Sequence, residues 1–281
     1  MKIAVTGATG FIGSNLIRHL SSRHQVIATY NIKSKIDKNY LYKKNIKWKF
    51  LDIHKNKNFF KYLNSPDLVI HLAWSNLPNY QLNFHERKEL PNQKKFIIDL
   101  VKNGLKNIFI AGSCLEYGYQ NGKLDENKKE IPNNKFAKAK CKLKKNIFFL
   151  QKKYEFNLIW GRIFYIYGKH NTRNTLYNQV INSSKEKNNK IFVSGNKIRD
   201  YLHIKKVCQI IINLSLKKIN FGLVNICSGK GITLKKLINN ISKLENVKPN
   251  VEYIKIIKKN IEPDTFWGCN KKLKACLQKN R

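Results

Sequence analysis

Three glycines near the start of the chain have the spacing of a turn that binds an anion through backbone N–H groups. Gly7, Gly10 and Gly13 follow an apolar segment at residues 3–5 and precede a helical pattern at residues 14–20. Such a turn between a strand and a helix directs N–H groups and the positive end of the helix dipole toward a phosphate. The spacing is Gly-x-x-Gly-x-x-Gly rather than Gly-x-Gly-x-x-Gly, and glycines also terminate strands. The position of these glycines, between a predicted strand and a predicted helix, favours a site for a dinucleotide pyrophosphate.

Strand-length apolar segments alternate with helix-length segments through the first part of the chain. The predicted strands cover residues 3–6, 26–29, 48–51, 68–72, 107–111 and 158–164. Two long helices are expected at residues 90–103 and 136–153, because apolar residues recur there at three- and four-residue spacing beside a lysine-rich face. The alternation predicts an α/β fold with a Rossmann-like, doubly wound parallel sheet that carries the glycine turn at a strand end.

The regular alternation decays after Tyr167 and Gly168, where loops mix with helices and short strands. We expect an NAD(P)-binding domain over residues 1–165 and a smaller substrate-binding portion over residues 166–281, partly interleaved with the first. No repeat or long linker separates two independent domains.

The net charge of +38 comes almost entirely from lysine, scattered with Asn and Ile through every segment. A nucleic-acid site would concentrate basic residues in a patch, often with arginines and stacking aromatic residues. We interpret the lysines as a compositional bias acting on a solvated surface, with weak, salt-sensitive adhesion to polyanions. A basic nucleic-acid-associated protein is the alternative from another class.

The six cysteines are far apart and have neither Cys-x-x-Cys spacing nor a partnered histidine. They are Cys114, Cys141, Cys208, Cys227, Cys269 and Cys276. We therefore expect reduced thiols, no disulfide framework and no metal site. No secretory leader and no apolar stretch of roughly 20 residues is present, so a soluble, cytoplasmic protein without a membrane partner is expected.

Several segments have the order and spacing of one large enzyme family. They are residues 6–13, 51–53, 71–73, 112–118 and 199–203. On them the chain resembles, over essentially its whole length, the extended short-chain dehydrogenases/reductases of the NAD-dependent epimerase/dehydratase family. More narrowly, residues 71–80, 112–118, 162–168 and 225–230 are similar to nucleotide-sugar 4-ketoreductases of the dTDP-6-deoxy-L-talose 4-dehydrogenase kind.

The resemblance assigns the cofactor contacts residue by residue. The implied pyrophosphate-binding turn consists of Gly7, Thr9, Gly10, Phe11, Ile12 and Gly13. Asp52 and Ile53 would lie at the adenine, and Leu72 and Ala73 beside the ribose and phosphates. A carboxylate after a strand end can accept the adenine amino group, although a turn or helix-capping Asp is about equally common.

The choice between NADP and NAD depends on residues 30–35, after the second predicted strand. An Asp or Glu there would bind the ribose 2′-hydroxyl group and repel a 2′-phosphate, and none is present. Lys33, Ser34 and Lys35 could instead neutralise that phosphate. The sequence therefore favours NADP over NAD, with both kept as candidates.

The resemblance also implies a catalytic Ser or Thr together with Tyr-x-x-x-Lys. In that set the tyrosine hydroxyl group exchanges the proton that accompanies hydride transfer, while the lysine lowers the tyrosine pKa and binds the nicotinamide ribose. Ser113 and Lys140 match, but Phe136 occupies the tyrosine position. Tyr117 and Tyr119 lie nearby in sequence, and Tyr117 is the named possible substitute.

Two functions therefore stay open. The first is NAD(P)-dependent hydride transfer on a nucleotide-activated deoxysugar, at a 4-keto group, by a reductase or an epimerase. The second is a catalytically impaired family member that binds the cofactor or the sugar nucleotide. Phe136 is the residue that separates them.

Substrate contacts are expected from the last motif and from the loop after Gly168. The resemblance places Arg199 at the nucleotide diphosphate, which a guanidinium can bind bidentately, whereas an ion pair with Asp200 is the structural alternative. Asn171 and Lys169 are further candidates. The family often pairs two subunits through helices equivalent to residues 90–103 and 136–153, so a homodimer is expected.

Overall fold

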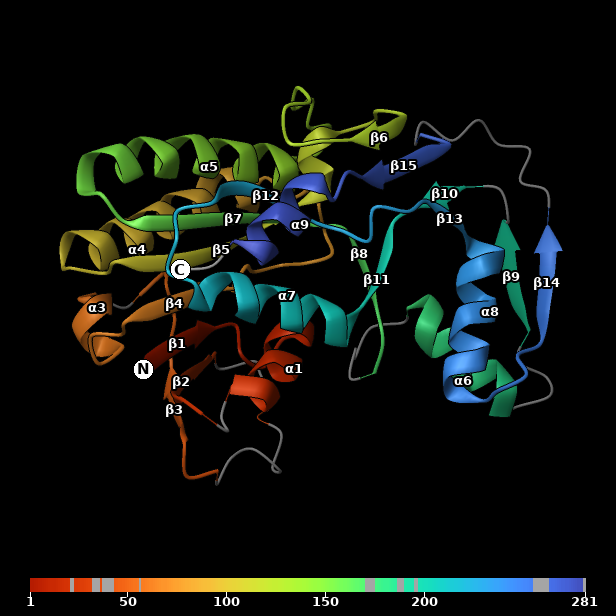
Figure 1. Cartoon of the computed structure of the whole chain (residues 1–281), viewed down its shortest axis with the longest axis horizontal. Helices are drawn as coiled ribbons and strands as arrows, with labels where there is room; N and C mark the ends of the chain where they lie inside the picture. The colour runs from red at the N-terminus through yellow and green to blue at the C-terminus, as the bar shows by residue number, and fades with distance from the viewer. Residues whose placement is uncertain are drawn as a thin grey trace.

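The computed structural model describes residues 1–20, 23–31, 36, 43–55, 57–169, 175–185, 190–194, 197–254 and 263–279. Its largest sheet has the strand order β12-β7-β5-β4-β1-β2-β3 (Figure 1). The strands are β1 (Lys2–Thr6), β2 (Gln25–Tyr30), β3 (Ile46–Phe50), β4 (Leu68–His71), β5 (Asn107–Ser113), β7 (Asn157–Ile163) and β12 (Gly222–Ile226). Every pairing is parallel. The doubly wound sheet predicted from the sequence is confirmed, with its topological switch point between β1 and β4.

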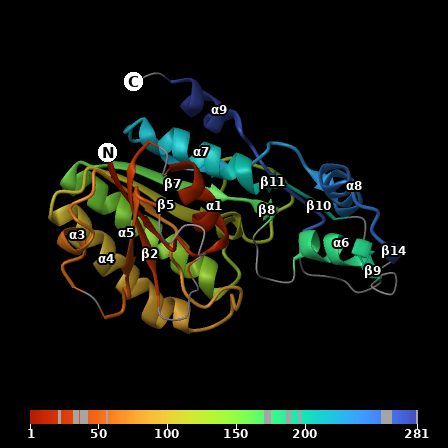
Figure 2. The ribbon, with the colours of Figure 1, turned by 90° about the horizontal axis from the view of Figure 1, so that it is seen from below.

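Helices cover both faces of this sheet (Figure 2). One face carries α1 (Phe11–Leu20), α7 (Ile204–Leu216) and α9 (Lys271–Gln278). The other carries α3 (Phe59–Tyr62), α4 (Leu90–Lys102) and α5 (Lys135–Tyr154). A π-helical turn, η1 (His85–Glu89), leads into α4, and a 3-10 turn, η2 (Cys114–Tyr117), follows β5. Both faces of each central strand are therefore buried, as continuous apolar segments predict.

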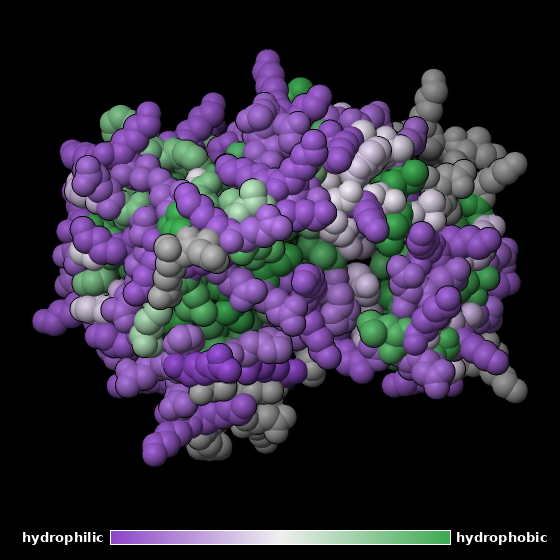
Figure 3. All heavy atoms as spheres, viewed as in Figure 1, coloured by the Kyte–Doolittle hydropathy of each residue, from purple (hydrophilic) through white to green (hydrophobic). Residues whose placement is uncertain are grey.

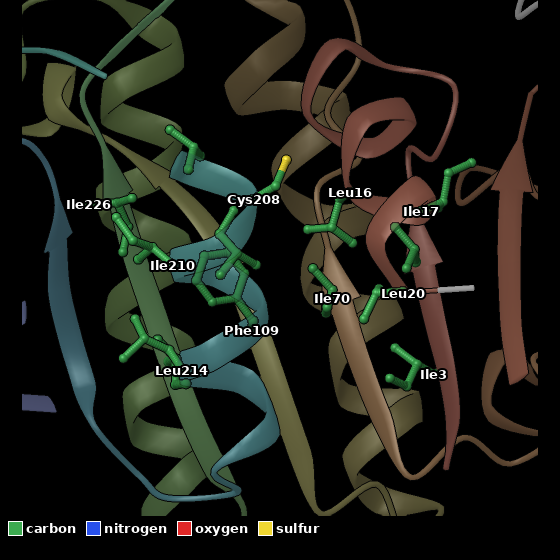
Figure 4. Close-up of a cluster of buried hydrophobic side chains, with 14 of the residues drawn as sticks. Ile3, Leu16, Ile17, Leu20, Ile70, Phe109, Cys208, Ile210, Leu214 and Ile226 are labelled. Carbon is green, nitrogen blue, oxygen red and sulfur yellow. The ribbon is translucent and has the colours of Figure 1, made fainter. Parts of the chain in front are cut away.

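Alternate residues of a strand enter opposite cores. Ile3 belongs to the cluster beneath α1 and α7, whereas Ala4 belongs to the cluster beneath α4 and α5. In the first cluster, Leu16 of α1 and Leu214 of α7 pack against the sheet near Phe109 of β5 (Figure 4). Each fully buried aliphatic side chain contributes about 1.5–3 kcal/mol relative to exposure. These two cores fix the strand ends that carry the site.

The first helix begins earlier than the sequence pattern indicates. We expected a helix from Ser14, but α1 starts at Phe11. The backbone N–H of Ser14 donates to the carbonyl oxygen of Gly10 at 2.8 Å, so the residues between them already form a helical turn. The glycine turn is therefore shorter, and its last glycine lies inside the helix.

The remaining strands form small sheets beyond the carboxyl end of the large one. The first is β13 (Ile232–Thr233), β10 (Ile198–Arg199), β15 (Thr265–Gly268) and β6 (Gly122–Leu124), in that order; the others pair β8 (Tyr165–Tyr167) with β11 (Tyr201–His203) and β9 (Ile191–Ser194) with β14 (Val251–Ile254). A third core lies between α6 (Leu176–Lys185) and α8 (Leu234–Glu245). Because α7 and β12 return to the large sheet, elements after residue 165 contribute to both parts. The expected boundary at that residue stays a prediction.

The surface and the helices relate to the expectations of a solvated surface and of no membrane-spanning segment. Hydrophilic residues spread across the face seen in Figure 3, over both the large sheet and the smaller part. Among the described helices, none has both the length and the apolar character needed to cross a membrane. All six cysteines are buried free thiols.

Candidate active site

The glycine turn between β1 and α1 has no room for side chains. Gly7 has a φ of 69°, and a Cβ atom there would lie 3.0 Å from the backbone N and Cα of Ala73. A Cβ atom on Gly13 would lie 2.2 Å from the carbonyl oxygen of Gly7, and one on Gly10 would lie 3.2 Å from the same oxygen. The close approach of the helix to the turn therefore requires glycine. This cradle fits a dinucleotide pyrophosphate, which needs backbone N–H groups with nothing in front of them.

The other expected turn residues open α1. Thr9 is half-buried in the turn, and Phe11 and Ile12 begin the helix with side chains packed partly against the core. The first N–H groups of a helix have no acceptor within it. Phe11 and Ile12 thus place backbone donors, rather than side chains, at the expected pyrophosphate position.

The ends of β1 and β4 are tied together by one hydroxyl group. Thr6 Oγ1 accepts the backbone N–H groups of Leu72 at 3.2 Å and Ala73 at 3.3 Å. The same oxygen lies 2.7 Å from His71 Nδ1. The carbonyl oxygen of Ala73 accepts Gln93 Nε2 at 2.9 Å. Leu72 and Ala73, expected beside the ribose and phosphates, are therefore held rigidly at the switch point.

A chain of buried polar groups continues from His71 beneath this edge. His71 Nε2 is hydrogen-bonded to Gln93 Oε1, and Gln93 Nε2 donates to Glu89 Oε1 at 2.8 Å. Glu89 also accepts the backbone N–H of Ser75 at 3.0 Å and lies 2.9 Å from His54 Nε2. Burial lowers the pKa of His71 to about 4, so its ring is neutral near pH 7. His71 therefore positions the strand end rather than exchanging protons with a substrate.

Asp52 and Ile53 follow β3 in a tight turn. Asp52 Oδ1 accepts the backbone N–H of His54 at 2.9 Å, and Ile53 is buried in the core beneath α4. The carboxylate thus performs the turn-forming role that the sequence left open beside adenine binding. The adenine contact stays a prediction for both residues.

Lys140 reaches the sheet from α5, whose N-terminus is capped by Asn134 accepting the N–H of Ala137 at 2.8 Å. Lys140 Nζ donates to the carbonyl oxygen of Ala111, near the end of β5, at 2.7 Å. It also lies 3.9 Å from the centroid of the Trp74 ring. Burial lowers the pKa of Lys140 to about 8. The ammonium group is bound here by one carbonyl oxygen and one aromatic face. It can exchange these contacts for a hydrogen bond to a ligand.

Phe136 lies one helical turn before Lys140 and is buried in an aromatic cluster. Its ring centroid is 5.6 Å from those of Trp74 and His85 and 5.4 Å from that of Tyr80. The indole N–H of Trp74 donates to His85 Nδ1 at 3.1 Å, which fixes the orientation of the indole. Phenylalanine therefore fills the tyrosine position with a ring packed on three sides, but with no proton to exchange.

Ser113 ends β5, two residues beyond the carbonyl group that binds Lys140. Its Oγ accepts the backbone N–H of Leu115 at 3.2 Å and caps η2, while Glu116 Oε1 accepts the backbone N–H of Ser113 at 2.8 Å. The hydroxyl proton of Ser113 can still be donated to a sugar oxygen. The structure thus brings Ser113 and Lys140 to the same strand end.

The hydroxyl group and the ring of Tyr117 are both engaged in buried contacts. Its hydroxyl group is 2.9 Å from Asn225 Oδ1 and 2.8 Å from the carbonyl oxygen of Asp125, and its ring lies under the Arg162 guanidinium. Burial raises the pKa of Tyr117 to about 12. These contacts make Tyr117 unsuited to the substitute role that the sequence left open. Tyr119, the other nearby tyrosine, is 49% exposed.

A buried ion pair underlies η2. Arg162 Nε donates to Glu116 Oε2 at 2.8 Å, and Arg162 Nη2 is bonded to Glu130. Glu116, Glu130 and Cys141 bring ligand-type atoms within 4.8 Å of one another, but both carboxylates are bonded to Arg162. Pairing compensates the burial of these charges. Glu116 supports Ser113, a role that only the capping pattern at residues 113–116 could have suggested.

The expected substrate residues have different surroundings. Arg199 is buried, and its Nη1 donates to the carbonyl oxygens of Ile198 at 2.9 Å and Asp264 at 3.2 Å. Asp200 accepts three backbone N–H groups, from Ser228, Gly229 and Gly268, so its carboxylate organises the backbone around β15. The contact of Arg199 with a diphosphate stays a prediction.

The remaining candidates lie near or in undescribed segments. Lys169 Nζ is paired with Glu245 at 2.7 Å. Asn171 and the cofactor-choosing residues Lys33, Ser34 and Lys35 lie outside the described residues.

These features define an α/β dinucleotide-binding protein with a lysine and a serine at the carboxyl edge of the sheet. The chain belongs to the NAD dependent epimerase/dehydratase family, whose model matches residues 3–227. The resemblance seen in the sequence is thereby confirmed.

Individual relatives are distant but cover nearly the whole chain. The chain is 26% identical over 271 residues to a dTDP-6-deoxy-L-talose 4-dehydrogenase (NAD(+)) of Aggregatibacter actinomycetemcomitans, covering 95% of this chain and 99% of the relative. It is similar in fold to a UDP-N-acetylglucosamine 4-epimerase from Methanobrevibacter ruminantium in complex with UDP-N-acetylmuramic acid, with a TM-score of 0.85, 20% identity and coverage of 100% and 93%. A UDP-glucuronic acid 4-epimerase from Bacillus cereus, in complex with UDP-glucuronic acid and NAD, has a TM-score of 0.82, 20% identity and coverage of 100% and 94%.

Proposed function

We propose that this chain binds a nicotinamide dinucleotide and a nucleotide-activated deoxysugar and transfers hydride at the sugar 4-position, as a reductase or an epimerase. The observation that carries the proposal is the ammonium group of Lys140, bonded to Ala111 near the carboxyl end of β5. The turn of Gly7, Gly10 and Gly13 lies at the same edge, after β1. A ligand spanning the switch point would reach both.

NAD is the dinucleotide that the relatives support. One relative carries NAD(+) in its name, and the Bacillus cereus structure holds NAD. The preference for NADP rested on Lys33, Ser34 and Lys35, and nothing in the comparisons supports it. When bound, the dinucleotide would supply or accept the hydride.

We assign the binding of the cofactor and the substrate to the following residues of the chain. The turn N–H groups would bind the pyrophosphate, and Lys140, which now donates to Ala111, would bind the nicotinamide ribose. Ser113 donates a hydrogen bond to the reacting sugar oxygen. Arg199 binds the nucleotide diphosphate, where a charge-assisted contact contributes about 1.5–3 kcal/mol.

Phe136 favours a second candidate function, a family member that binds these ligands with little turnover. General acid–base help is worth about 10²–10⁴ in rate, so its loss would leave binding intact and chemistry slow. The measured turnover separates the two candidates.

Two subunits would associate through α4 and α5. Phe149 of α5 is 72% exposed, which supports an apolar contact on that helix. Sedimentation of the purified protein tests this arrangement.

The function is tested by titrating the protein with NAD, NADP and a panel of nucleotide sugars. Calorimetry and the shift in melting temperature measure the binding. NAD should bind at least as tightly as NADP, and one sugar nucleotide should bind in its presence. Arg199→Ala should weaken that sugar nucleotide about tenfold or more without changing NAD affinity. Lys272→Ala, which removes an exposed cation of α9, is the matched control. Failure of every sugar nucleotide to bind would refute the proposal.

A further inference from the structure

We propose that the hydroxyl group of Tyr80, on the segment between β4 and η1, performs the proton transfer for which Phe136 has no group. The inference rests on the hydride-transfer function proposed above. The rings of Tyr80 and Phe136 are in contact, with centroids 5.4 Å apart and planes at 42°. The backbone N–H of Phe136 donates to the carbonyl oxygen of Tyr80 at 3.0 Å. These contacts hold Tyr80 against the first turn of α5.

Tyr80 and the lysine of the site share the same aromatic neighbour. Lys140 Nζ lies 5.9 Å from the centroid of the Phe136 ring and 3.9 Å from that of Trp74, and the Trp74 ring packs edge-on against Phe136. A cation in this position favours the charged form of a nearby phenol. Tyr80 and Lys140 therefore both border the Phe136 ring, one from the segment before η1 and the other from α5.

The other groups near Phe136 are less suited to proton transfer. Both ring nitrogens of His85 are engaged, Nδ1 with the Trp74 indole N–H and Nε2 with the carbonyl oxygen of Asn79 at 2.9 Å. His85 is also fully buried, whereas Tyr80 is 37% exposed and can exchange a proton with water. Among the ring contacts described for Phe136, Tyr80 alone carries a hydroxyl group.

The step balances with the ligands already proposed. In the reducing direction, the sugar carbonyl carbon accepts hydride, with its electron pair, from the reduced dinucleotide, and the carbonyl π bond breaks. The carbonyl oxygen takes the proton of the Tyr80 hydroxyl group, which leaves a phenolate on Tyr80. Water then returns the proton to Tyr80. The oxidising direction runs through the same atoms in reverse.

The test replaces the hydroxyl group and then restores it in the usual position. Tyr80→Phe should lower kcat about 10²-fold while KM and NAD affinity change less than about twofold. Phe136→Tyr in the Tyr80→Phe background should recover tenfold or more of the lost rate. Tyr253→Phe, at another exposed tyrosine on β14, should change nothing. In ultraviolet titrations of the NAD complex, one phenol with a lowered pKa should be present in the natural protein and absent from Tyr80→Phe.

The outcomes separate this proposal from the function on which it rests. Full turnover of Tyr80→Phe would overturn it, and so would a lost rate that Phe136→Tyr does not recover, since that pattern indicates a structural role. If the natural protein binds the sugar nucleotide without turnover, the phenol titration decides, and an unchanged titration of Tyr80→Phe overturns the proposal. Absence of sugar-nucleotide binding by the natural protein would instead refute the hydride-transfer function.

Discussion

The glycine turn after β1 and the first turn of α5 both border the proposed site but depend on the sequence differently. The turn uses backbone groups, and its only demand is that Gly7, Gly10 and Gly13 lack side chains. The start of α5 uses side chains, and a single change at Phe136 removes the proton-transfer group while the ring still packs. A turn that relies on backbone groups can therefore keep its geometry when a side chain of a neighbouring element is replaced.

Two alanine substitutions in the turn should have unequal effects. A Cβ atom on Gly13 would lie 2.2 Å from the carbonyl oxygen of Gly7, whereas one on Gly10 would lie 3.2 Å from it. Gly13→Ala should destabilise the fold by about 3 kcal/mol and abolish measurable NAD binding. Gly10→Ala should cost about 1 kcal/mol or less and weaken NAD binding without unfolding the protein. Denaturant unfolding and calorimetry measure both, and equal losses would show that the backbone of the turn is not what limits binding.

Lys140→Met should separate activity from stability. Turnover should fall about 10²-fold, because the variant loses the cation of the site. The stability of the variant should equal or exceed that of the natural protein. Burial lowers the pKa of Lys140 in the folded protein to about 8. Between pH 8 and the ordinary lysine pKa, the unfolded chain therefore binds more protons at this residue than the folded protein does. Charging this group thus costs stability below about pH 8, and the cost disappears as the pH rises above it. Activity of the natural protein should decline as the pH rises through about 8.

Lys142→Met is the control for that change. Lys142 lies on the same helix with an exposed side chain paired to Glu86 at 2.7 Å. The Lys142→Met substitution should leave the pH profile of activity unaltered. A pH profile of Lys140→Met identical to that of the natural protein would remove Lys140 from the reaction.

His71→Gln should have the smallest effect near pH 7 and a visible one in acid. Burial lowers the pKa of His71 from its ordinary value to about 4, so the unfolded chain binds a proton first as the pH falls from 6.5 to 4. The natural protein should therefore lose about 3 kcal/mol of stability over that interval from this group. Unfolding measured at pH 7 and pH 4 should show a smaller loss in the variant. An equal loss in both proteins would indicate that acid acts through other groups.

The fold was largely predictable because central parallel strands are apolar on both faces. Residues 3–6 and 107–111 were expected as strands and lie within β1 and β5. The glycine turn was predictable for the same reason, since its elements are contiguous in sequence. The start of α1 at Phe11 was not, because glycines permit a turn and a helix equally well until packing decides.

The candidate site was predictable only where a motif carries it. Ser113 and Lys140 follow from the resemblance to the family motif, and the structure brings them to one strand end. The partners of Tyr117 could not be foreseen, because Asn225 lies 108 residues away along the chain. Tyr80 was missed for the same reason, since its contact with Phe136 joins a loop to a helix over 50 residues later. Only the fold brings such pairs together.

The position of Lys140 over the Trp74 ring links the charge of the proposed site to an indole. The indole is fixed by its hydrogen bond to His85, so the ring stays still when the ammonium group 3.9 Å from its centroid moves. Indole emission responds to the electric field across the ring, and a ligand that draws Lys140 toward a ribose changes that field. If Lys140 moves as proposed, occupancy of the site should change the share of the intrinsic fluorescence that comes from Trp74.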